Sequence, residues 1–204
     1  FFSSATSVLR SEGEKPLAAL LELPRPWHAP DLQAISGLSF VDRRDGCIVT
    51  TGPEPMLVHD QQGRLDRQRA LDRYPSPYLD GVVPDEYFHD KTVVSILTSR
   101  GCPYRCIYCQ FSSLNDHRVY FHSIDRVMAE IDWIRSRVLR FHPGKAHVFI
   151  MVYDEALTLS RRRIESLCTR LIDRRYDPPV KLWIDTRADH VDQPMIERLK
   201  QAGV

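Results

Sequence analysis

The sequence has 204 residues, of which 43% are hydrophobic and 27% are charged, and its 28 Lys and Arg residues nearly cancel 27 Asp and Glu residues. A chain of this length can bury a core of its own, and the balanced charge excludes both a disordered polyelectrolyte and a globally basic nucleic-acid binder. The best apolar run, residues 17–23, is far too short to span a membrane. We therefore expect a soluble globular protein with no membrane and no nucleic-acid partner. Because residue 1 is Phe, we expect the sequence to be a segment of a longer one.

The first 90 residues carry most of the prolines and show weak hydrophobic periodicity. A short helix is predicted over residues 16–23, with Pro16 in its first turn. Residues 38–41 and 47–50 flank a polar turn that ends in Gly46, which predicts a hairpin. Residues 73–78 contain two prolines, so they can form neither a regular helix nor a central strand. We interpret them as a linker that lies over another surface, and residues 1–90 as a connector.

From residue 91 onward, strand and helix patterns alternate. Three short apolar, β-branched stretches predict buried parallel strands. Each is followed by apolar residues at helical spacing, with Ser123 as a predicted cap of the first helix and Asp192 opening the third. The predicted strands are residues 92–97, 147–152 and 180–184, and the predicted helices begin near residues 124, 161 and 193. Three consecutive strand–helix units indicate an α/β fold with a parallel sheet and right-handed crossovers.

Three of the five cysteines, Cys102, Cys106 and Cys109, lie in one short loop directly after the first predicted strand. Cys47 and Cys168 stand alone, and we interpret both as small core residues. An odd total with a tight triplet indicates a reducing compartment, by default the cytoplasm, and metal ligation. Thiolates are soft ligands, so the candidates are zinc and an iron–sulfur cluster. Structural zinc usually needs a fourth ligand from a second pair, whereas three cysteines would leave one iron of a 4Fe–4S cluster open.

The triplet resembles the signature of the radical S-adenosylmethionine (SAM) enzymes, C-x3-C-x-aromatic-C, with Tyr108 as the aromatic residue. The resemblance implies an α/β partial TIM-like (β/α) barrel, here truncated after about three strand–helix units, over residues 91–204. The residues around the cysteines look like the subgroup with an upstream cobalamin-binding domain, so residues 1–90 would be the connector and remnant of such a domain. The D-x-H-x-x-G cobalamin motif does not occur in the 204 residues. Cobalamin is therefore expected, if at all, in the full-length protein.

In that family, Cys102, Cys106 and Cys109 would hold a 4Fe–4S cluster, and SAM would bind its open iron. A reductant such as flavodoxin or ferredoxin would supply the electron that cleaves SAM, starting methyl transfer, cyclisation or a related reaction on an unidentified substrate. The resemblance places Tyr108 by the adenine of SAM. It also places Asp154 and Glu155, at the end of the second strand, by the SAM ammonium, where a charge-assisted hydrogen bond would fix it. Arg187, after the third strand, is a candidate for the SAM carboxylate.

Plainer interpretations stand beside each of these. The cysteine loop could be a structural zinc knuckle of a non-catalytic interaction domain, or the segment could bind a cluster and turn over nothing. Asp154 and Glu155 could be a helix-capping or solvated acidic pair, and Arg187 could be a surface ion-pair residue.

Overall fold

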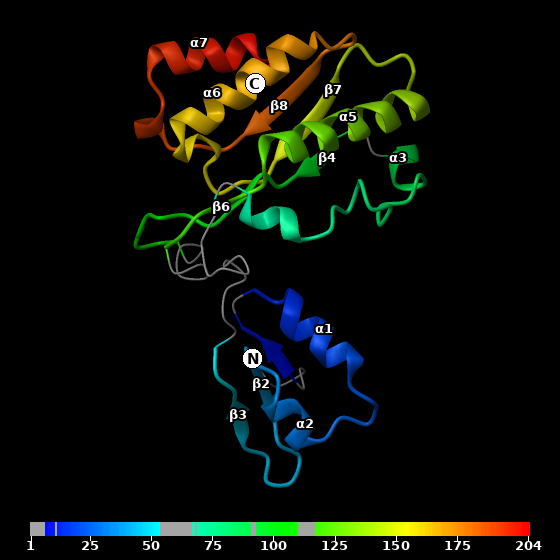
Figure 1. Cartoon of the computed structure of the whole chain (residues 1–204), viewed down its shortest axis with the longest axis vertical. Coiled ribbons are helices and arrows are strands. Elements are labelled where there is room, and N and C mark those ends of the chain that lie inside the picture. Colours follow the sequence, from blue (N-terminus) through cyan, green and yellow to red (C-terminus); the bar gives the residue numbers. More distant parts are fainter. Residues whose placement is uncertain (1–6, 11, 54–66, 68, 91–92, 110–116) are drawn as a thin grey trace. The chain divides into compact units, whose positions relative to one another are not determined.

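The computed structural model describes residues 7–10, 12–53, 67, 69–90, 93–109 and 117–204 (Figure 1). The described residues up to 53 form one compact unit, and those from 67 onward form a second. Among these residues, no helix combines the length and the apolar character that crossing a bilayer requires.

The first unit is a three-stranded antiparallel sheet with two short helices. Its strands β1 (Ser7–Leu9), β2 (Leu38–Val41) and β3 (Ile48–Thr50) pair in the order β1-β2-β3. The helices are α1 (Glu14–Glu22) and α2 (Ala29–Gln33). Both the predicted helix and the predicted hairpin are therefore confirmed.

The hairpin turn owes its shape to two residues. Gly46 has a φ of +74°, a backbone conformation that favours glycine. The carboxylate of Asp42 accepts hydrogen bonds from the main-chain N–H and the guanidinium of Arg44, and this holds the pKa of Asp42 at about 2. Cys47 follows the turn with its side chain exposed, so its interpretation as a core residue is wrong. Cys47 belongs to an exposed stretch, residues 43–48, that covers the turn and the start of β3.

The second unit contains a parallel sheet. Strands β4 (Val93–Ile96), β7 (Val148–Val152) and β8 (Val180–Ile184) pair in the order β4-β7-β8. Val94 is the register partner of Ile150, which is in turn the partner of Leu182. The mixed α/β fold with a parallel sheet is confirmed. No closed barrel forms among the described residues, and the partial TIM-like barrel stays a prediction.

Three longer helices complete the strand–helix units: α5 (Ile124–Phe141), α6 (Arg161–Arg174) and α7 (Gln193–Gln201). The predicted caps are present. The Ser123 hydroxyl accepts a hydrogen bond from the Arg126 N–H at 3.2 Å, and Asp192 accepts one from the Met195 N–H at 2.9 Å. Each cap satisfies an N–H group that the first turn of a helix leaves unpaired.

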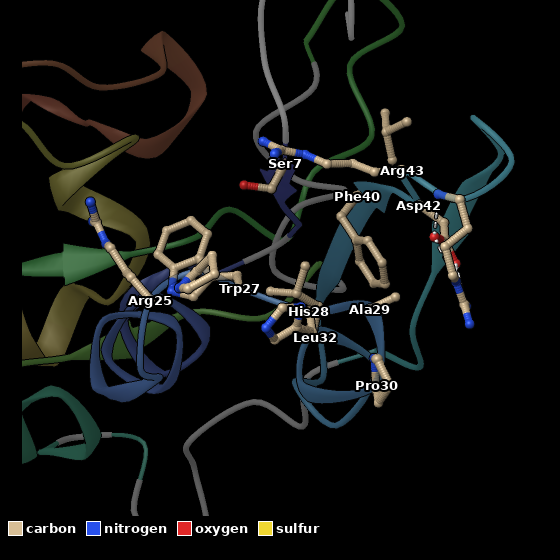
Figure 2. A pocket seen from close by; sticks show the side chains of 13 residues that line it. Ser7, Arg25, Trp27, His28, Ala29, Pro30, Leu32, Phe40, Asp42 and Arg43 are labelled. Carbon is tan, nitrogen blue, oxygen red and sulfur yellow. Dashed lines mark hydrogen bonds and ion pairs between the residues drawn. The ribbon is translucent and has the colours of Figure 1, made fainter.

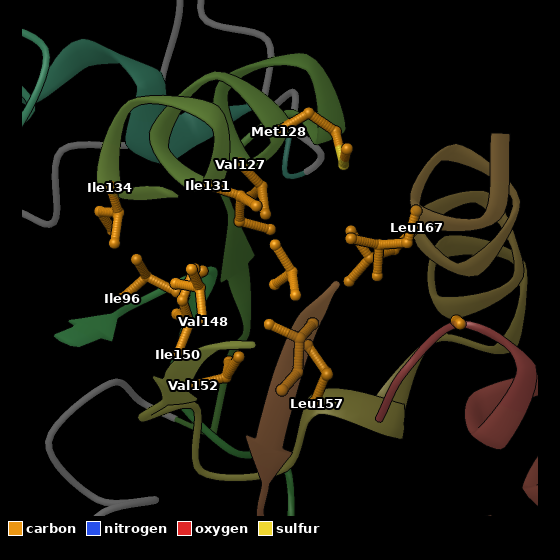
Figure 3. Close-up of a cluster of buried hydrophobic side chains, with 14 of the residues drawn as sticks. Ile96, Val127, Met128, Ile131, Ile134, Val148, Ile150, Val152, Leu157 and Leu167 are labelled. Carbon is orange, nitrogen blue, oxygen red and sulfur yellow. The ribbon is translucent and has the colours of Figure 1, made fainter. Parts of the chain in front are cut away.

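The core lies between the sheet and helices α5 and α6. In Figure 3, Val127 and Ile131 of α5 and Leu167 of α6 point toward Ile150 and Val152 of β7, and all of these are buried. Cys168 is also buried in this core, as predicted.

The opposite face of the sheet is largely bare within the described residues. Val93, Phe149 and Trp183 are 48%, 41% and 61% exposed. Side chains alternate between the two faces of a strand, so these three lie on the face that the helices do not cover. The prediction of fully buried strands therefore holds for one face only.

Shorter elements pack around the sheet. A two-stranded ribbon joins β5 (Ser99–Arg100) to β6 (Tyr120–Phe121). Two short helices precede β4, namely η1 (Ala70–Arg73) and α3 (Tyr87–Asp90). Two more follow the later strands, namely η2 (Leu157–Leu159) and η3 (Ala188–His190).

The proline-rich linker lies on α5. The buried Ser76 hydroxyl donates a hydrogen bond to Glu130 at 2.7 Å, and Arg126 donates to the Tyr74 carbonyl at 2.7 Å. Tyr78 donates its hydroxyl proton to the Ser95 carbonyl of β4. Residues 69–90, interpreted as connector, thus pack as part of the second unit.

Candidate functional site

The three clustered cysteines lie on an irregular loop that leaves the carboxyl end of β4 by way of β5. Cys102, Cys106 and Cys109 are free thiols of intermediate exposure, and a hydrogen bond of 3.0 Å from the Cys109 N–H to the Cys106 carbonyl closes a tight turn. Tyr108 stands at the tip of this turn and is 87% exposed. The carboxyl ends of parallel strands are where such folds build their sites.

The three thiols of the loop are soft ligands, of the kind that bind zinc and iron–sulfur clusters. Among the described residues, no three His, Cys, Asp or Glu side chains are grouped to hold one metal ion. A zinc ion needs its ligands at about 2.3 Å from one centre, whereas a 4Fe–4S cluster attaches each thiolate to a different iron. The three thiols therefore match in kind the protein ligands of a 4Fe–4S cluster.

Asp154, just after β7, is buried and fully engaged by the segment that leads into the cysteine loop. Its carboxylate accepts hydrogen bonds from the main-chain N–H groups of Thr98 and Ser99 at 2.6 and 3.0 Å. It also accepts from the hydroxyls of the same two residues, each at 2.6 Å. Asp154 therefore ties the exit of β4 to the end of β7.

Arg163 of α6 contacts the same segment through the main-chain carbonyl of Thr98. Its guanidinium donates to the Thr98 carbonyl at 3.1 Å and lies 4.8 Å from the centroid of the Phe121 ring. Burial lowers the pKa of Arg163 to about 10, although the charge of Asp154 opposes this shift. Both polar groups of the Thr98 backbone are thus hydrogen-bonded before the cysteines begin.

Glu155 contacts the cysteine loop itself. Its carboxylate accepts a hydrogen bond from the Gly101 N–H, next to Cys102, at 3.1 Å. Burial raises the pKa of Glu155, and the neighbouring charge of Asp154 adds to that shift. In contrast to Asp154, this carboxylate accepts one hydrogen bond from the loop, so it retains acceptor capacity for another donor.

Arg187 also reaches the cysteine loop. Its guanidinium pairs with Asp189 and donates a hydrogen bond to the Cys106 sulfur at 3.5 Å. The structure therefore brings Arg187 to Cys106, and it brings Glu155 to Gly101, the residue before Cys102. Tyr108 projects away from these groups toward solvent.

Sequence reasoning missed the residues that hold this loop: Thr98, Ser99, Tyr104, Arg163 and His190. Tyr104 lies between cysteines of the motif, and its hydroxyl is hydrogen-bonded to the His190 ring. A Thr-Ser pair at the end of a strand is a usable signal, because two hydroxyls and two N–H groups together match one carboxylate. Arg163 and His190 carry no such local signal.

A cavity of about 710 Å³ lies in the first unit (Figure 2). Trp27 and Phe40 form part of its wall, and Arg25 lies with its guanidinium 4.9 Å from the centroid of the Trp27 ring. None of the residues that line it is one of the predicted cofactor ligands.

Comparison with known proteins agrees with the site. The Radical SAM superfamily profile matches residues 96–204, more than half of the chain. The cysteine loop and helices α5, α6 and α7 fall within the match, as do β7 and β8, and β4 ends at its first residue. The chain belongs to the Radical SAM superfamily.

Curated relatives match nearly the whole chain. An uncharacterized methyltransferase of Pyrococcus horikoshii, PH0819, is 24% identical over 198 residues, which are 97% of this chain and 38% of the relative. An anaerobic magnesium-protoporphyrin IX monomethyl ester cyclase of Cereibacter sphaeroides is 25% identical over 214 residues, covering 97% of this chain and 30% of the cyclase. This chain thus spans about a third of the length of these relatives.

Two solved structures share the fold. TsrM, a radical SAM methyltransferase of Kitasatospora setae solved with cobalamin and a [4Fe-4S] cluster, superimposes with a TM-score of 0.64 at 20% identity. The match covers 97% of this chain and 36% of TsrM. OxsB, a cobalamin-dependent SAM radical enzyme, gives a TM-score of 0.57 at 24% identity, covering 96% and 25% of the two chains.

Proposed function

We propose that this chain is part of a radical SAM enzyme in which Cys102, Cys106 and Cys109 hold a 4Fe–4S cluster. One observation carries the proposal: three free thiols occupy one loop at the carboxyl end of β4, and Glu155 is hydrogen-bonded to that loop. When bound, such a cluster supplies the electron that breaks a carbon–sulfur bond of SAM and starts radical chemistry. The protein supplies the thiolates and the fixed loop geometry.

Glu155 is the proposed partner of the SAM ammonium. It lies beside Gly101 with acceptor capacity to spare, whereas the Asp154 oxygens are already taken by Thr98 and Ser99. Partial burial makes the charged form of Glu155 costly and so raises its pKa, and a SAM ammonium beside the carboxylate would offset that cost. Tyr108 remains the proposed neighbour of adenine, on the same turn as Cys106 and Cys109.

The wider assignments rest on similarity. Residues 91–204 are proposed as the N-terminal half of a radical SAM barrel, and residues 1–90 as the connector and remnant of an upstream cobalamin-type domain, of which residues 69–90 pack with the second unit. The names of TsrM and OxsB support cobalamin in the full-length protein. The methyltransferase and cyclase among the relatives support methyl transfer or cyclisation, with flavodoxin or ferredoxin as reductant. Five free cysteines support a reducing compartment such as the cytoplasm.

Anaerobic purification followed by iron and sulfide analysis tests the proposal. We expect a brown protein with about four irons and four sulfides per chain, and visible absorption that bleaches with dithionite. Cys106→Ala should lose the cluster. Cys47→Ala is the matched control, because Cys47 is exposed and lies in the first unit. Colourless protein carrying zinc, or iron content unchanged by Cys106→Ala, would refute the proposal.

Turnover is a separate question from cluster binding. With dithionite and SAM, an active chain releases methionine and 5′-deoxyadenosine, which chromatography detects. A protein that carries the cluster but forms neither product is the inactive segment considered above. Running the same assay on the intact reading frame shows whether the rest of the protein completes the site.

A further inference from the structure

Arg187 contacts two residues of the cysteine loop, Tyr104 and Cys106, and one residue of η3, Asp189. Its Nε and Nη2 atoms donate to the two carboxylate oxygens of Asp189 at 2.9 and 2.8 Å. Its Nη1 atom donates to the Cys106 sulfur at 3.5 Å. The guanidinium carbon lies 4.1 Å from the centroid of the Tyr104 ring. The planar guanidinium of Arg187 is thus held by Asp189 through Nε and Nη2, while its Nη1 atom faces the Cys106 sulfur.

The turn that follows β8 holds the loop at a second point. Tyr104 and His190 are hydrogen-bonded through the phenol oxygen and the imidazole Nε2, and their rings are 5.2 Å apart between centroids. His190 belongs to η3, which begins directly after Arg187. Two residues of this turn, Arg187 and His190, therefore contact the cysteine loop at two places, Cys106 and Tyr104.

We propose that Arg187 is a positioning residue that hydrogen-bonds the Cys106 thiolate and raises the reduction potential of the cluster. This inference rests on the proposed function. It differs from the expected role of Arg187 at the SAM carboxylate, because here the charge acts on a cluster ligand.

The direction of the effect follows from charge. Reduction adds one negative charge to the cluster and its thiolates. A fixed cation and an N–H donor at a ligating sulfur stabilise that added charge, so the reduced state is favoured. Asp189 holds the Arg187 guanidinium in place beside the Cys106 sulfur. The Tyr104 ring, stacked against the guanidinium, restricts movement of the guanidinium out of its own plane.

Redox titration of the reconstituted chain, followed by electron paramagnetic resonance, tests this. We expect Arg187→Gln to lower the equilibrium constant for reduction about tenfold, which for a one-electron couple is a fall of about 59 mV. Arg187→Lys keeps the charge but loses the guanidinium, so we expect a smaller fall. Arg161→Gln is the matched control: Arg161 pairs with Glu165 and Asp192 at an exposed helix start, and its loss should leave the potential unchanged.

Resonance Raman spectra give a second readout, because loss of a hydrogen bond to Cys106 changes the iron–sulfur(Cys) stretching frequencies. If Arg187→Gln retains too little iron to titrate, Arg187→Lys decides, since it keeps the positive charge and loses the guanidinium that bridges Asp189 and Cys106. A lower potential in Arg187→Lys supports the inference, and a wild-type potential overturns it. Wild-type protein without iron would instead refute the proposed function. Iron in every variant with one common potential would refute the role of Arg187 alone.

Discussion

The carboxylate of Asp154 is hydrogen-bonded twice to Thr98: one oxygen accepts its main-chain N–H and the other its hydroxyl, both at 2.6 Å. The same pattern recurs at Ser99. Four donors therefore converge on one buried carboxylate, and these hydrogen bonds fix the backbone of Thr98 and Ser99, which leads from β4 to the cysteines. An acidic residue that the sequence suggested for a cofactor is therefore also a structural link between two strands.

Asp154→Asn should destabilise the second unit by about 2 kcal/mol or more, because the new amide group would face donors and leave at least one of them unpaired. Urea unfolding followed by circular dichroism measures the loss. Asp173→Asn, an exposed position on α6, is the control and should change stability by less than about 0.5 kcal/mol. An equally small effect at Asp154 would contradict the linking role.

Glu155→Gln should make the protein more stable at neutral pH. The folded-state pKa of Glu155 is raised by burial, so the folded protein binds its proton more tightly than the unfolded chain does. This tighter proton binding stabilises the fold fully at pH values below the unfolded-state pKa of Glu155. The stabilisation is lost as pH rises through the folded-state pKa, because the half-buried carboxyl must then ionise. Glutamine removes that loss and can still accept the Gly101 hydrogen bond. Urea midpoints should therefore differ most at neutral pH and converge on acidification.

The same Glu155→Gln protein should bind SAM more weakly once its cluster is reconstituted, because an amide lacks the charge that pairs with an ammonium. Equilibrium binding of SAM measures this. Lower stability at neutral pH together with unchanged SAM affinity would show that Glu155 is a structural residue instead. If Glu155→Gln is more stable than the wild type and binds SAM more weakly, Glu155 is a functional residue whose charge costs stability.

Ser76→Ala should loosen the proline-rich linker from α5. The buried Ser76 hydroxyl donates to Glu130 and accepts from the N–H groups of Tyr78 and Leu79. Its removal leaves those N–H groups unpaired, at a cost of about 1–3 kcal/mol. Hydrogen exchange should accelerate at Tyr78 and Leu79. The exposed Ser136→Ala should leave those amides as protected as in the wild type.

Cluster loading should protect Tyr108 from chymotrypsin. Ile107 and Tyr108 are exposed side chains at a tight turn between two cysteines, which is an accessible cleavage site. Thiolates bound to one cluster would restrain that turn on both sides. Mass spectrometry of timed digests should show cleavage after Tyr108 in the iron-free chain and slower cleavage in the reconstituted chain. Equal rates with a full cluster would refute the restraint.

Local signals predicted the elements of the second unit well. Ser123 and Asp192 cap helices as expected, because a cap depends on residues three positions away. Strand and helix periodicity likewise predicted the parallel pairing of β4, β7 and β8. The cysteine spacing pointed to the family, since it lies within eight consecutive residues.

Contacts between distant segments could not be predicted. Asp154 and Thr98 are 56 residues apart, and Arg187 and Cys106 are 81 apart, so nothing in either local sequence reveals the pairing. The exposure of Cys47 depended on the direction of one side chain after a turn. The linker at residues 73–78 was expected to lie over a surface, but that surface, α5, became evident only from the fold.

The uncovered side of the parallel sheet has a practical consequence for anyone who handles this protein. The exposed side chains of Val93, Phe149 and Trp183 form a hydrophobic surface on this face of the sheet. Exposed hydrophobic surfaces of this kind favour self-association. Light scattering should therefore increase steeply with concentration. Spectra of the iron centre are best recorded in dilute samples, where colour reports on single molecules.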